Sequence, residues 1–363
     1  MDGVLFEAWL ESIRLLTARQ RQAGFACLAL AEADDDWDSI SSDTAPHGRL
    51  SAEDPSGASD GVPPEARRPT ETGAPVLPAS ALAAAQSRIE HSGCPHCASR
   101  ELQRWGRVSD LPRYRCRACR RTFNGLTGTP MARLRRKDRW AAQAEALIAC
   151  DSVVKAAKRC GVAKTTAFRW RHRFLAASTL DKPARLNGIV EADETFILES
   201  FKGRRSDLPR PARKRGGKAA KRGLSAEQIP VLVARDRHGS TTDAVLPKLN
   251  RASVAAALGG VVTPDNQLCC DGGKAIVGFA RKGGIPCQIL PSPGGPRPEA
   301  PNLHINNING YHSRLKEWLR PFHGVATKYL DTYLGWRRIA EARGGGVQPA
   351  DWLRSAVGVG CYQ

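Results

Sequence analysis

Four cysteines in two short pairs are the side chains whose spacing points most directly to chemistry. Two residues separate Cys94 from Cys97 and Cys116 from Cys119, and 18 residues lie between the pairs. Such turns present four thiolates to a single tetrahedral Zn²⁺, and the gap is long enough for a hairpin that returns the chain. The pattern therefore predicts a zinc ribbon over residues 90–126 whose folding depends on the metal. A redox or disulfide role for the same pairs is the alternative.

A second group of chemically capable residues consists of acids embedded in apolar, strand-like runs. Asp193 interrupts the run at residues 188–197, and Asp271 ends a short run at residues 267–270 just before a glycine turn. A carboxylate in a buried element needs a partner, and a metal ion is one such partner. The alternative is that both acids only cap or bridge nearby backbone.

The elements that must position these acids follow from the hydrophobic pattern. Residues 229–234 and 242–246 are typical of strands joined by a hairpin at 236–239, and a helix is expected near 252–259. Three meandering strands, a helix and a returning strand favour an α/β ribonuclease-H-like core with a mixed sheet. We place this catalytic domain at residues 186–343.

A helical region precedes that core. Residues 138–150, 152–159 and 164–175 have helical periodicity, with Ser152 as a cap and Gly161 as a turn. We therefore predict a helix-turn-helix DNA-binding domain over residues 135–176, whose third helix enters the major groove. Its candidate DNA contacts are Lys164, Thr165, Thr166, Arg169 and Arg173. A helical connector with an ordinary solvated basic face is the alternative.

The charge distribution favours a polyanionic partner. The formal net charge is +19, but residues 1–90 are acidic, so residues 91–363 alone carry 48 Lys and Arg against 21 Asp and Glu. Such a field attracts nucleic acid, although a merely soluble basic surface would give the same count. Residues 202–222 contain ten Lys or Arg and one Asp. We interpret them as a flexible basic insertion between strands that binds the DNA backbone, for example through Arg213, Lys214 and Arg215.

Taken in order, these motifs resemble the bacterial insertion-sequence transposases of the DDE class, which pair an N-terminal zinc ribbon with a ribonuclease-H-like core. The resemblance covers roughly residues 90–340 and rests on VEADETF at 190–196, CCDGGKA at 269–275, HINNINGYHSRLKEWL at 304–319 and KYLDTYLGWRR at 328–338.

The resemblance implies that Asp193 and Asp271 bind catalytic Mg²⁺ (or Mn²⁺) and that Asn309 occupies the third position, which is usually Glu. Asparagine offers a neutral carbonyl oxygen, so it can ligate the metal but adds no charge and cannot act as a base. Lys316 matches the family's lysine and lies seven residues further on, hence on the same helical face, where it could hold a phosphate. A helix-surface or packing role remains the alternative for Asn309. The reserve ligands are Glu191, Glu194 and Glu317.

By the same resemblance the protein would be a DDE-type DNA transposase, a nuclease and polynucleotidyl transferase that binds terminal inverted repeats, cleaves DNA and transfers strands. Its partners would be double-stranded DNA of transposon ends and target, together with further copies of itself as a homo-oligomer. Zn²⁺ would be structural. A catalytically inactive, transposase-derived DNA-binding regulator is the alternative, made credible by Asn309. A zinc-ribbon transcription factor would leave the acids unexplained.

The remaining segments complete the expected organisation. Residues 1–33 read as an N-terminal helical segment, residues 34–89 as a disordered acidic linker and residues 344–363 as a C-terminal tail. No apolar stretch is long enough to cross a bilayer and no signal peptide is recognisable, so we expect no membrane partner and a cytoplasmic, nucleoid-associated location.

Overall fold

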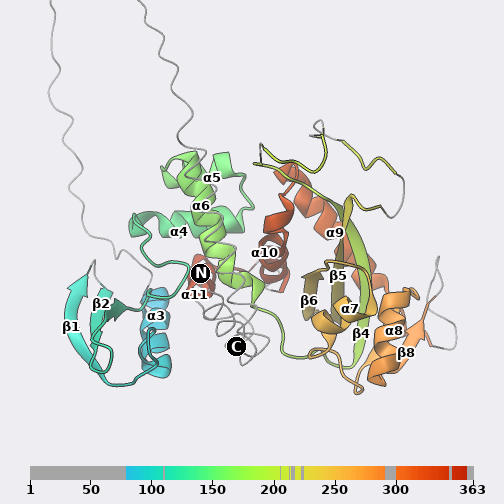
Figure 1. Cartoon of the computed structure of the whole chain (residues 1–363), viewed down its shortest axis with the longest axis horizontal. Helices are drawn as coiled ribbons and strands as arrows, with labels where there is room; N and C mark the ends of the chain where they lie inside the picture. Colours follow the sequence, from blue (N-terminus) through green and yellow to red (C-terminus); the bar gives the residue numbers. More distant parts are fainter. Residues whose placement is uncertain are drawn as a thin grey trace, which may run out of the picture. The chain divides into compact units, whose positions relative to one another are not determined.

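A computed structural model of the chain describes residues 79–108, 111–204, 206–211, 213, 217–221, 225–290, 300–342 and 346–357. All of them belong to one compact unit that begins at Pro75 (Figure 1). The expected helical segment 1–33 and residues 34–78 of the expected linker lie outside the described residues. Within the described ranges, none of the helices combines the length and apolar character that crossing a membrane requires.

The cysteine-containing region is a small antiparallel sheet with a helix against it. Helix α3 (Ala79–Ser92) precedes strands β1 (Leu102–Val108), β2 (Leu111–Cys116) and β3 (Thr122–Asn124), which pair in that order. Helix α3 overlaps the end of the segment expected to be a linker. Its Ala85 and Ile89 are buried, and a Cβ at Gly125 would lie 2.8 Å from the Ala85 carbonyl oxygen. Close packing on the sheet supplies the burial that the local composition alone does not.

Three consecutive helices follow, where the sequence predicted them. They are α4 (Trp140–Ile148), preceded by the 3-10 turn η1 (Lys137–Arg139), α5 (Val153–Cys160) and α6 (Lys164–Leu175). The Ser152 hydroxyl accepts a hydrogen bond from the Lys155 amide and caps α5. Gly161 ends α5 with φ 61°, a left-handed conformation that favours glycine.

The core that carries the acids is a five-stranded mixed sheet in the order β6-β5-β4-β7-β8 (Figure 1). Strands β4, β5 and β6 are antiparallel neighbours, whereas β7 is parallel to β4 and β8 is parallel to β7. The strands are β4 (Ile189–Leu198), β5 (Gln228–Asp236), β6 (Thr241–Val245), β7 (Gln267–Cys270) and β8 (Cys287–Ile289). This arrangement, with helices on the sheet, is compatible with the ribonuclease-H-like core expected from the sequence.

Helices cover both faces of the sheet. On one face α7 (Arg251–Leu258) and α8 (Lys274–Gly283) bury Val190 and Ala192 of β4. The other face packs against α9 (Asn306–Leu319) through Ile308, Tyr311 and Leu315. Because side chains alternate along a strand, Glu191 and Asp193 of β4 face α9, whereas Glu194 faces α8.

The helical region and the sheet region share a core. Helices α10 (Leu330–Ala342) and α11 (Pro349–Ala356), with the 3-10 turns η2 (Ala176–Thr179), η3 (Arg320–Phe322) and η4 (Thr327–Tyr329), complete the described elements. Trp336 of α10 and Trp352 of α11 are buried in one cluster with Trp140 and Phe174. The segment 344–363, expected to be a tail, therefore contains a packed helix.

Candidate active site and nucleic-acid interface

Asp193 lies within the central strand β4, and Asp271 directly follows the neighbouring parallel strand β7, so the two acids lie beside the carboxyl-terminal edge of β7. The register pairs Glu191 of β4 with Cys269 of β7, and two residues further along each chain are Asp193 and Asp271. Adjacent strands are about 4.8 Å apart, and the Asp193 side chain projects to the face that packs against α9. Asp271 Oδ1 accepts a hydrogen bond from the Gly273 amide at 3.0 Å, just before α8. The fold thus brings together two acids that are 78 residues apart in the sequence.

Glu194 is a third acid at this edge, on the opposite face. An ideal Cβ at Gly273 would lie 3.1 Å from Glu194 Oε1 and 3.4 Å from Asp271 Oδ1, so both carboxylates approach the same glycine backbone. Burial, followed by the negative charges of Asp193 and Asp271, raises the pKa of Glu194 to about 7. Its Oε2 is buried and has no hydrogen-bond partner among the described residues. The site therefore has an excess of negative charge that a cation would relieve.

Helix α9 supplies a group that contacts Asp193. His312 is 7% exposed, its Nδ1 lies 3.4 Å from Asp193 Oδ2, and its Nε2 has no partner among the described residues. Asn309 and Lys316 are exposed and lie one turn before and one turn after His312, at the rim of the buried face. Asn309, His312 and Lys316 thus form one stripe along the helix, and its central residue contacts Asp193.

The start of α9 is held in place by Glu191. This carboxylate is 1% exposed, accepts a hydrogen bond from the Ile308 amide at 2.8 Å and forms an ion pair with Arg237. Arg237, in the β5–β6 hairpin, also donates to the carbonyl oxygens of Asn302 and His304. Glu191, a reserve ligand in the sequence analysis, is therefore engaged in docking α9. Glu317, another reserve ligand, is exposed and pairs with Arg320.

Comparison with known families identifies this part of the chain. Residues 185–337 match the family model of the ISXO2-like transposase domain. Residues 185–337 are therefore similar to an ISXO2-like transposase domain, and we refer to them below as the transposase domain. The chain is also 29% identical over 250 residues to an uncharacterized protein in transposable element ISH50 of Halobacterium salinarum, an alignment that covers 66% of this chain and 82% of that protein. No solved structure matches the chain.

The transposase domain contains all four residues that the sequence analysis placed in an active site. The matched range begins before β4 and ends within α10, so it includes Asp193, Asp271, Asn309 and Lys316. The family match supports an insertion-sequence transposase without assigning roles to individual side chains.

Outside the transposase domain, the four cysteines converge as a metal site requires. Their sulfur atoms all lie within 4.8 Å of one another, with Cys94 and Cys119 at 3.7 Å and Cys97 and Cys116 at 3.6 Å. A tetrahedron of sulfurs around Zn²⁺ at about 2.3 Å has edges of about 3.8 Å. The Cys119 amide donates to Cys116 Sγ and lowers the pKa of that thiol, which favours the ligating thiolate. The group could therefore hold a metal such as zinc.

Most candidate DNA contacts on α6 share one face of that helix. Thr165, Arg169 and Arg173 are four residues apart and Thr166 is beside them, so they form a stripe that we call the α6 stripe. Thr165 and Arg169 are exposed, and Arg173 is half-buried. The opposite face, with Trp170, is buried. Lys164, at the first position of α6, is exposed.

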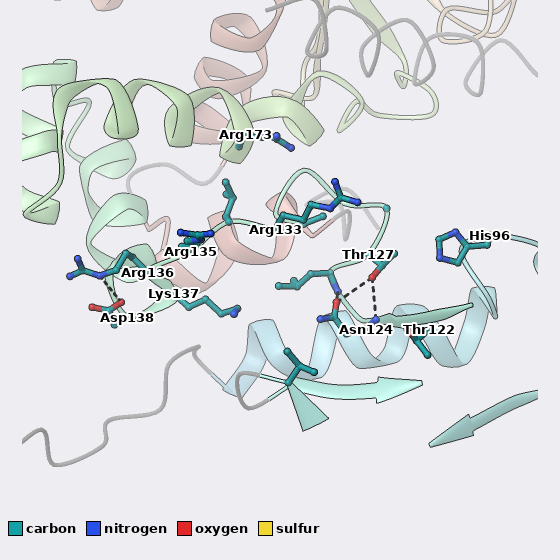
Figure 2. A pocket seen from close by; sticks show the side chains of 15 residues that line it. His96, Thr122, Asn124, Thr127, Arg133, Arg135, Arg136, Lys137, Asp138 and Arg173 are labelled. Atoms are coloured by element: carbon teal, nitrogen blue, oxygen red, sulfur yellow. Dashed lines mark hydrogen bonds and ion pairs between the residues drawn. The ribbon is translucent and has the colours of Figure 1, made fainter. Parts of the chain in front are cut away.

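The α6 stripe ends at a basic cavity of about 1020 Å³, which we call the ribbon groove. Figure 2 shows Arg173 reaching toward it from α6, Arg133 and Arg135 from the segment before α4, and Thr127 from the segment after β3. The ribbon groove is lined by five basic side chains and by Asp138 as the one acid. Asp138 is itself paired with neighbouring arginines.

The predicted basic insertion lacks helix and strand in its described residues, between β4 and β5. Arg213 is engaged within the protein: it donates a hydrogen bond to the Glu199 carbonyl oxygen and forms a 2.9 Å ion pair with Glu227. Lys202 donates to the carbonyl oxygens of Phe322 and Gly324. Lys214 and Arg215, proposed from the sequence as DNA contacts, lie outside the described residues.

Sequence reasoning missed three features of these sites. It did not single out His312, although this residue lies between Asn309 and Lys316 in helical spacing. It gave Arg237 no role beyond the hairpin. It also did not foresee the ribbon groove, because the groove's walls come from segments whose proximity only the fold creates.

Proposed function

We propose that the protein is a transposase that binds the terminal inverted repeats of an insertion sequence and catalyses metal-dependent DNA cleavage and strand transfer. The observation that carries this proposal is the proximity of Asp193 on β4 and Asp271 just after the neighbouring strand β7, with both negative charges acting on Glu194 and with His312 of the α9 stripe beside Asp193. The transposase-domain match supports the reaction class. A protein with this function acts at the nucleoid.

The residues at the sheet edge fit a hard divalent cation such as Mg²⁺ or Mn²⁺. Asp193, Asp271 and the amide oxygen of Asn309 are oxygen donors, and the buried, unpartnered Glu194 oxygen marks a local excess of negative charge. Among the described residues, the cysteines are the one group of three or more His, Cys, Asp or Glu whose ligand atoms already converge. The acids would therefore need the Asn309 oxygen to complete their donor set. When bound, the ions activate the attacking hydroxyl and stabilise the leaving oxygen of a phosphodiester displacement.

The protein's own groups orient the reaction. Lys316, exposed one turn beyond His312, is placed to hold a phosphate of the cleaved strand. His312 fixes the orientation of the Asp193 carboxylate through its Nδ1 contact. Glu191 and Arg237 hold the start of α9, which carries Asn309 one turn before His312.

DNA binding is assigned to the region before the transposase domain. The α6 stripe would read the major groove of the repeat, and a zinc ribbon at the four cysteines would support the same DNA. We further propose that the protein assembles as a homo-oligomer on its DNA, because two transposon ends must be processed together.

The enzyme proposal is tested by nicking of labelled DNA that carries the element's end. We expect Asp193→Asn and Asp271→Asn each to reduce Mg²⁺-dependent nicking at least about 1000-fold, with DNA affinity retained. Asp265→Asn is the matched control, since this exposed acid lies at the other end of β7. Nicking at the control's rate in either active-site variant would show that the two aspartates do not catalyse the reaction.

The inactive regulator remains the second candidate, because Asn309 cannot supply a third negative charge. It predicts that the wild-type chain binds repeat-end DNA but does not nick it with Mg²⁺ or Mn²⁺. The same assay therefore separates the two functions.

A further inference from the structure

We propose that the ribbon groove binds the phosphodiester backbone of double-stranded DNA next to the segment that the α6 stripe reads. This inference deepens the proposed function by assigning a sequence-independent contact site to a cavity whose walls come from the ribbon, the segment before α4 and the end of α6. Its ligand would be duplex DNA rather than a small anion.

The ribbon groove contains positive charge that no acid of the described segments neutralises. Among the residues that the structure describes, none pairs with the side chains of Arg133, Arg135 or Lys137, all of which line the ribbon groove. The one acid in the lining, Asp138, contacts Arg136 at 3.5 Å and Arg139 at 3.0 Å. A hollow with several unpaired cations and one already neutralised acid attracts polyanions.

The backbone that carries these cations is the second argument. Arg133 has φ 61° and Arg136 has φ 53°, so two arginines within four residues adopt the left-handed conformation. Non-glycine residues rarely adopt it, and such strain concentrates at ligand-binding segments. Buried anchors hold the segment on either side, with Met131 and Trp140 in the shared core and Trp140 Nε1 donating to the Arg135 carbonyl. The arginines are therefore presented by a fixed segment.

The length of α6 is the third argument. The α6 stripe runs from Thr165 to Arg173, eight residues or about 12 Å along the helix axis. The major groove of B-DNA is about 12 Å wide. When the first turn of α6 contacts base edges, the Arg173 end reaches the phosphates that border the groove. The ribbon groove begins at that end, with Thr127 and Asn124 of the cysteine-containing region on its far wall (Figure 2).

The test uses the full chain with EDTA omitted to retain zinc, no Mg²⁺, and a 30-bp duplex DNA of arbitrary sequence. The variant is Arg133→Gln/Arg135→Gln/Lys137→Gln. We expect its affinity to fall at least about tenfold near 0.1 M salt, and the slope of log affinity against log salt to decrease by roughly 2 to 3. The matched control is Lys248→Gln/Arg281→Gln/Lys282→Gln, which removes three exposed cations from the transposase domain. Its slope should change by less than about 1.

Further measurements keep the outcome clear. Zinc content and thermal melting of both triple variants establish that they fold. If the groove triple variant does not fold, the double variant Arg133→Gln/Arg135→Gln replaces it. An unchanged salt slope in the groove variant, or an equal loss in the control, would overturn the inference. The same titration is repeated with duplex RNA of the same sequence. If the groove variant lost affinity for the RNA but not for the DNA, the assignment to DNA would also be overturned. If the wild-type chain bound no DNA, the proposed function itself would fail, whereas DNA binding with an unchanged groove variant would refute the groove alone.

Discussion

At the scale of single residues, the proposed active site is a set of acids whose repulsion is only partly balanced. Asp193 contacts His312, while the half-buried Glu194 lies close to Asp193 and Asp271 and has a raised pKa. His312 has one ring nitrogen toward Asp193 and the other without a partner among the described residues. Within the proposed function, this geometry favours a positioning role in which His312 orients Asp193.

His312 can be tested by replacing it with residues that keep or lose its hydrogen bond. We expect His312→Leu to lower Mg²⁺-dependent nicking by roughly 10- to 100-fold and to raise the Mg²⁺ concentration needed for half-maximal rate. His312→Gln should recover part of the loss, because its amide can still donate to Asp193. DNA affinity should be unchanged in both variants, and Ser313→Ala, an exposed neighbour, serves as the control. A wild-type rate in His312→Leu would show that Asp193 needs no partner on α9.

At the scale of elements, helix α6 has an exposed polar and basic face and an opposite face that packs against the core. The α6 stripe is directed away from the core. Arg171 and His172, by contrast, are buried against the C-terminal part of the transposase domain. Arg171 donates to the Tyr333 hydroxyl and to the Asp151 carbonyl, and His172 stacks on Tyr329 with ring centroids 3.9 Å apart. The helix that would read DNA is therefore fixed to the domain that would cut it.

The buried His172 predicts a pH dependence of stability. Burial, followed by the positive charges of Arg171 and Lys328, lowers the pKa of His172 to about 3. The unfolded chain then binds a proton more readily than the folded chain, so the stabilising contribution is complete above about pH 6.5 and is lost as the pH falls toward 3. Between pH 7.5 and 5.0 we expect a loss of about 2 kcal/mol in the free energy of unfolding that His172→Phe does not show.

Urea unfolding followed by tryptophan fluorescence at the two pH values measures this difference. His238→Gln, a change at an exposed histidine of the β5–β6 hairpin, should retain the wild-type pH dependence. Because the comparison uses the change with pH, any constant packing cost of phenylalanine cancels. Equal pH dependence in the wild type and His172→Phe would contradict a neutral, buried imidazole.

At the scale of the whole molecule, the described residues after Pro75 form one compact unit rather than separate modules. Trp336 Nε1 donates to the Leu147 carbonyl of α4, and Arg338 forms a buried ion pair with Asp243 of β6 while also donating to the Ser178 carbonyl. Helix α10 thus joins the helical region to the sheet. The four-cysteine group lies at the edge of this unit, around a small cluster formed with Ile89 and Phe123.

That small cluster predicts a local effect of metal removal. We expect one zinc per chain, lost in Cys116→Ser, and limited proteolysis of the metal-free protein should cut within residues 93–125 while residues 185–337 stay intact. Mass spectrometry of the fragments gives the cleavage sites, and Cys160→Ser, a change at a buried thiol of α5, controls for loss of a cysteine. Duplex affinity should fall in parallel, because the cysteine-containing region forms one wall of the ribbon groove. Early cleavage inside the sheet would contradict this local role.

Local sequence signals were enough to predict several helices and strands and to identify the chemically capable side chains. Hydrophobic periodicity and the caps at Ser152 and Gly161 located α5 and α6, and short apolar runs located strands β4 to β7, because these signals act between neighbours in the chain. Strand β8 was not expected from the sequence. The spacing of the cysteines likewise indicated a shared metal. Such signals say little about segments that become ordered only through contacts with distant parts of the chain. Helices α3 and α11 are such segments, and the sequence had predicted a linker and a tail in their place.

Which of these side chains come into contact depends on the fold. Glu191 could have been a ligand by its sequence context, but the fold directs it to the amide of Ile308, 117 residues away, and leaves His312 against Asp193. The ribbon groove likewise depends on the fold, because the walls that surround its cations come from separate segments of the chain. The physical reason is that burial and charge pairing depend on long-range packing, which no local pattern of residues encodes.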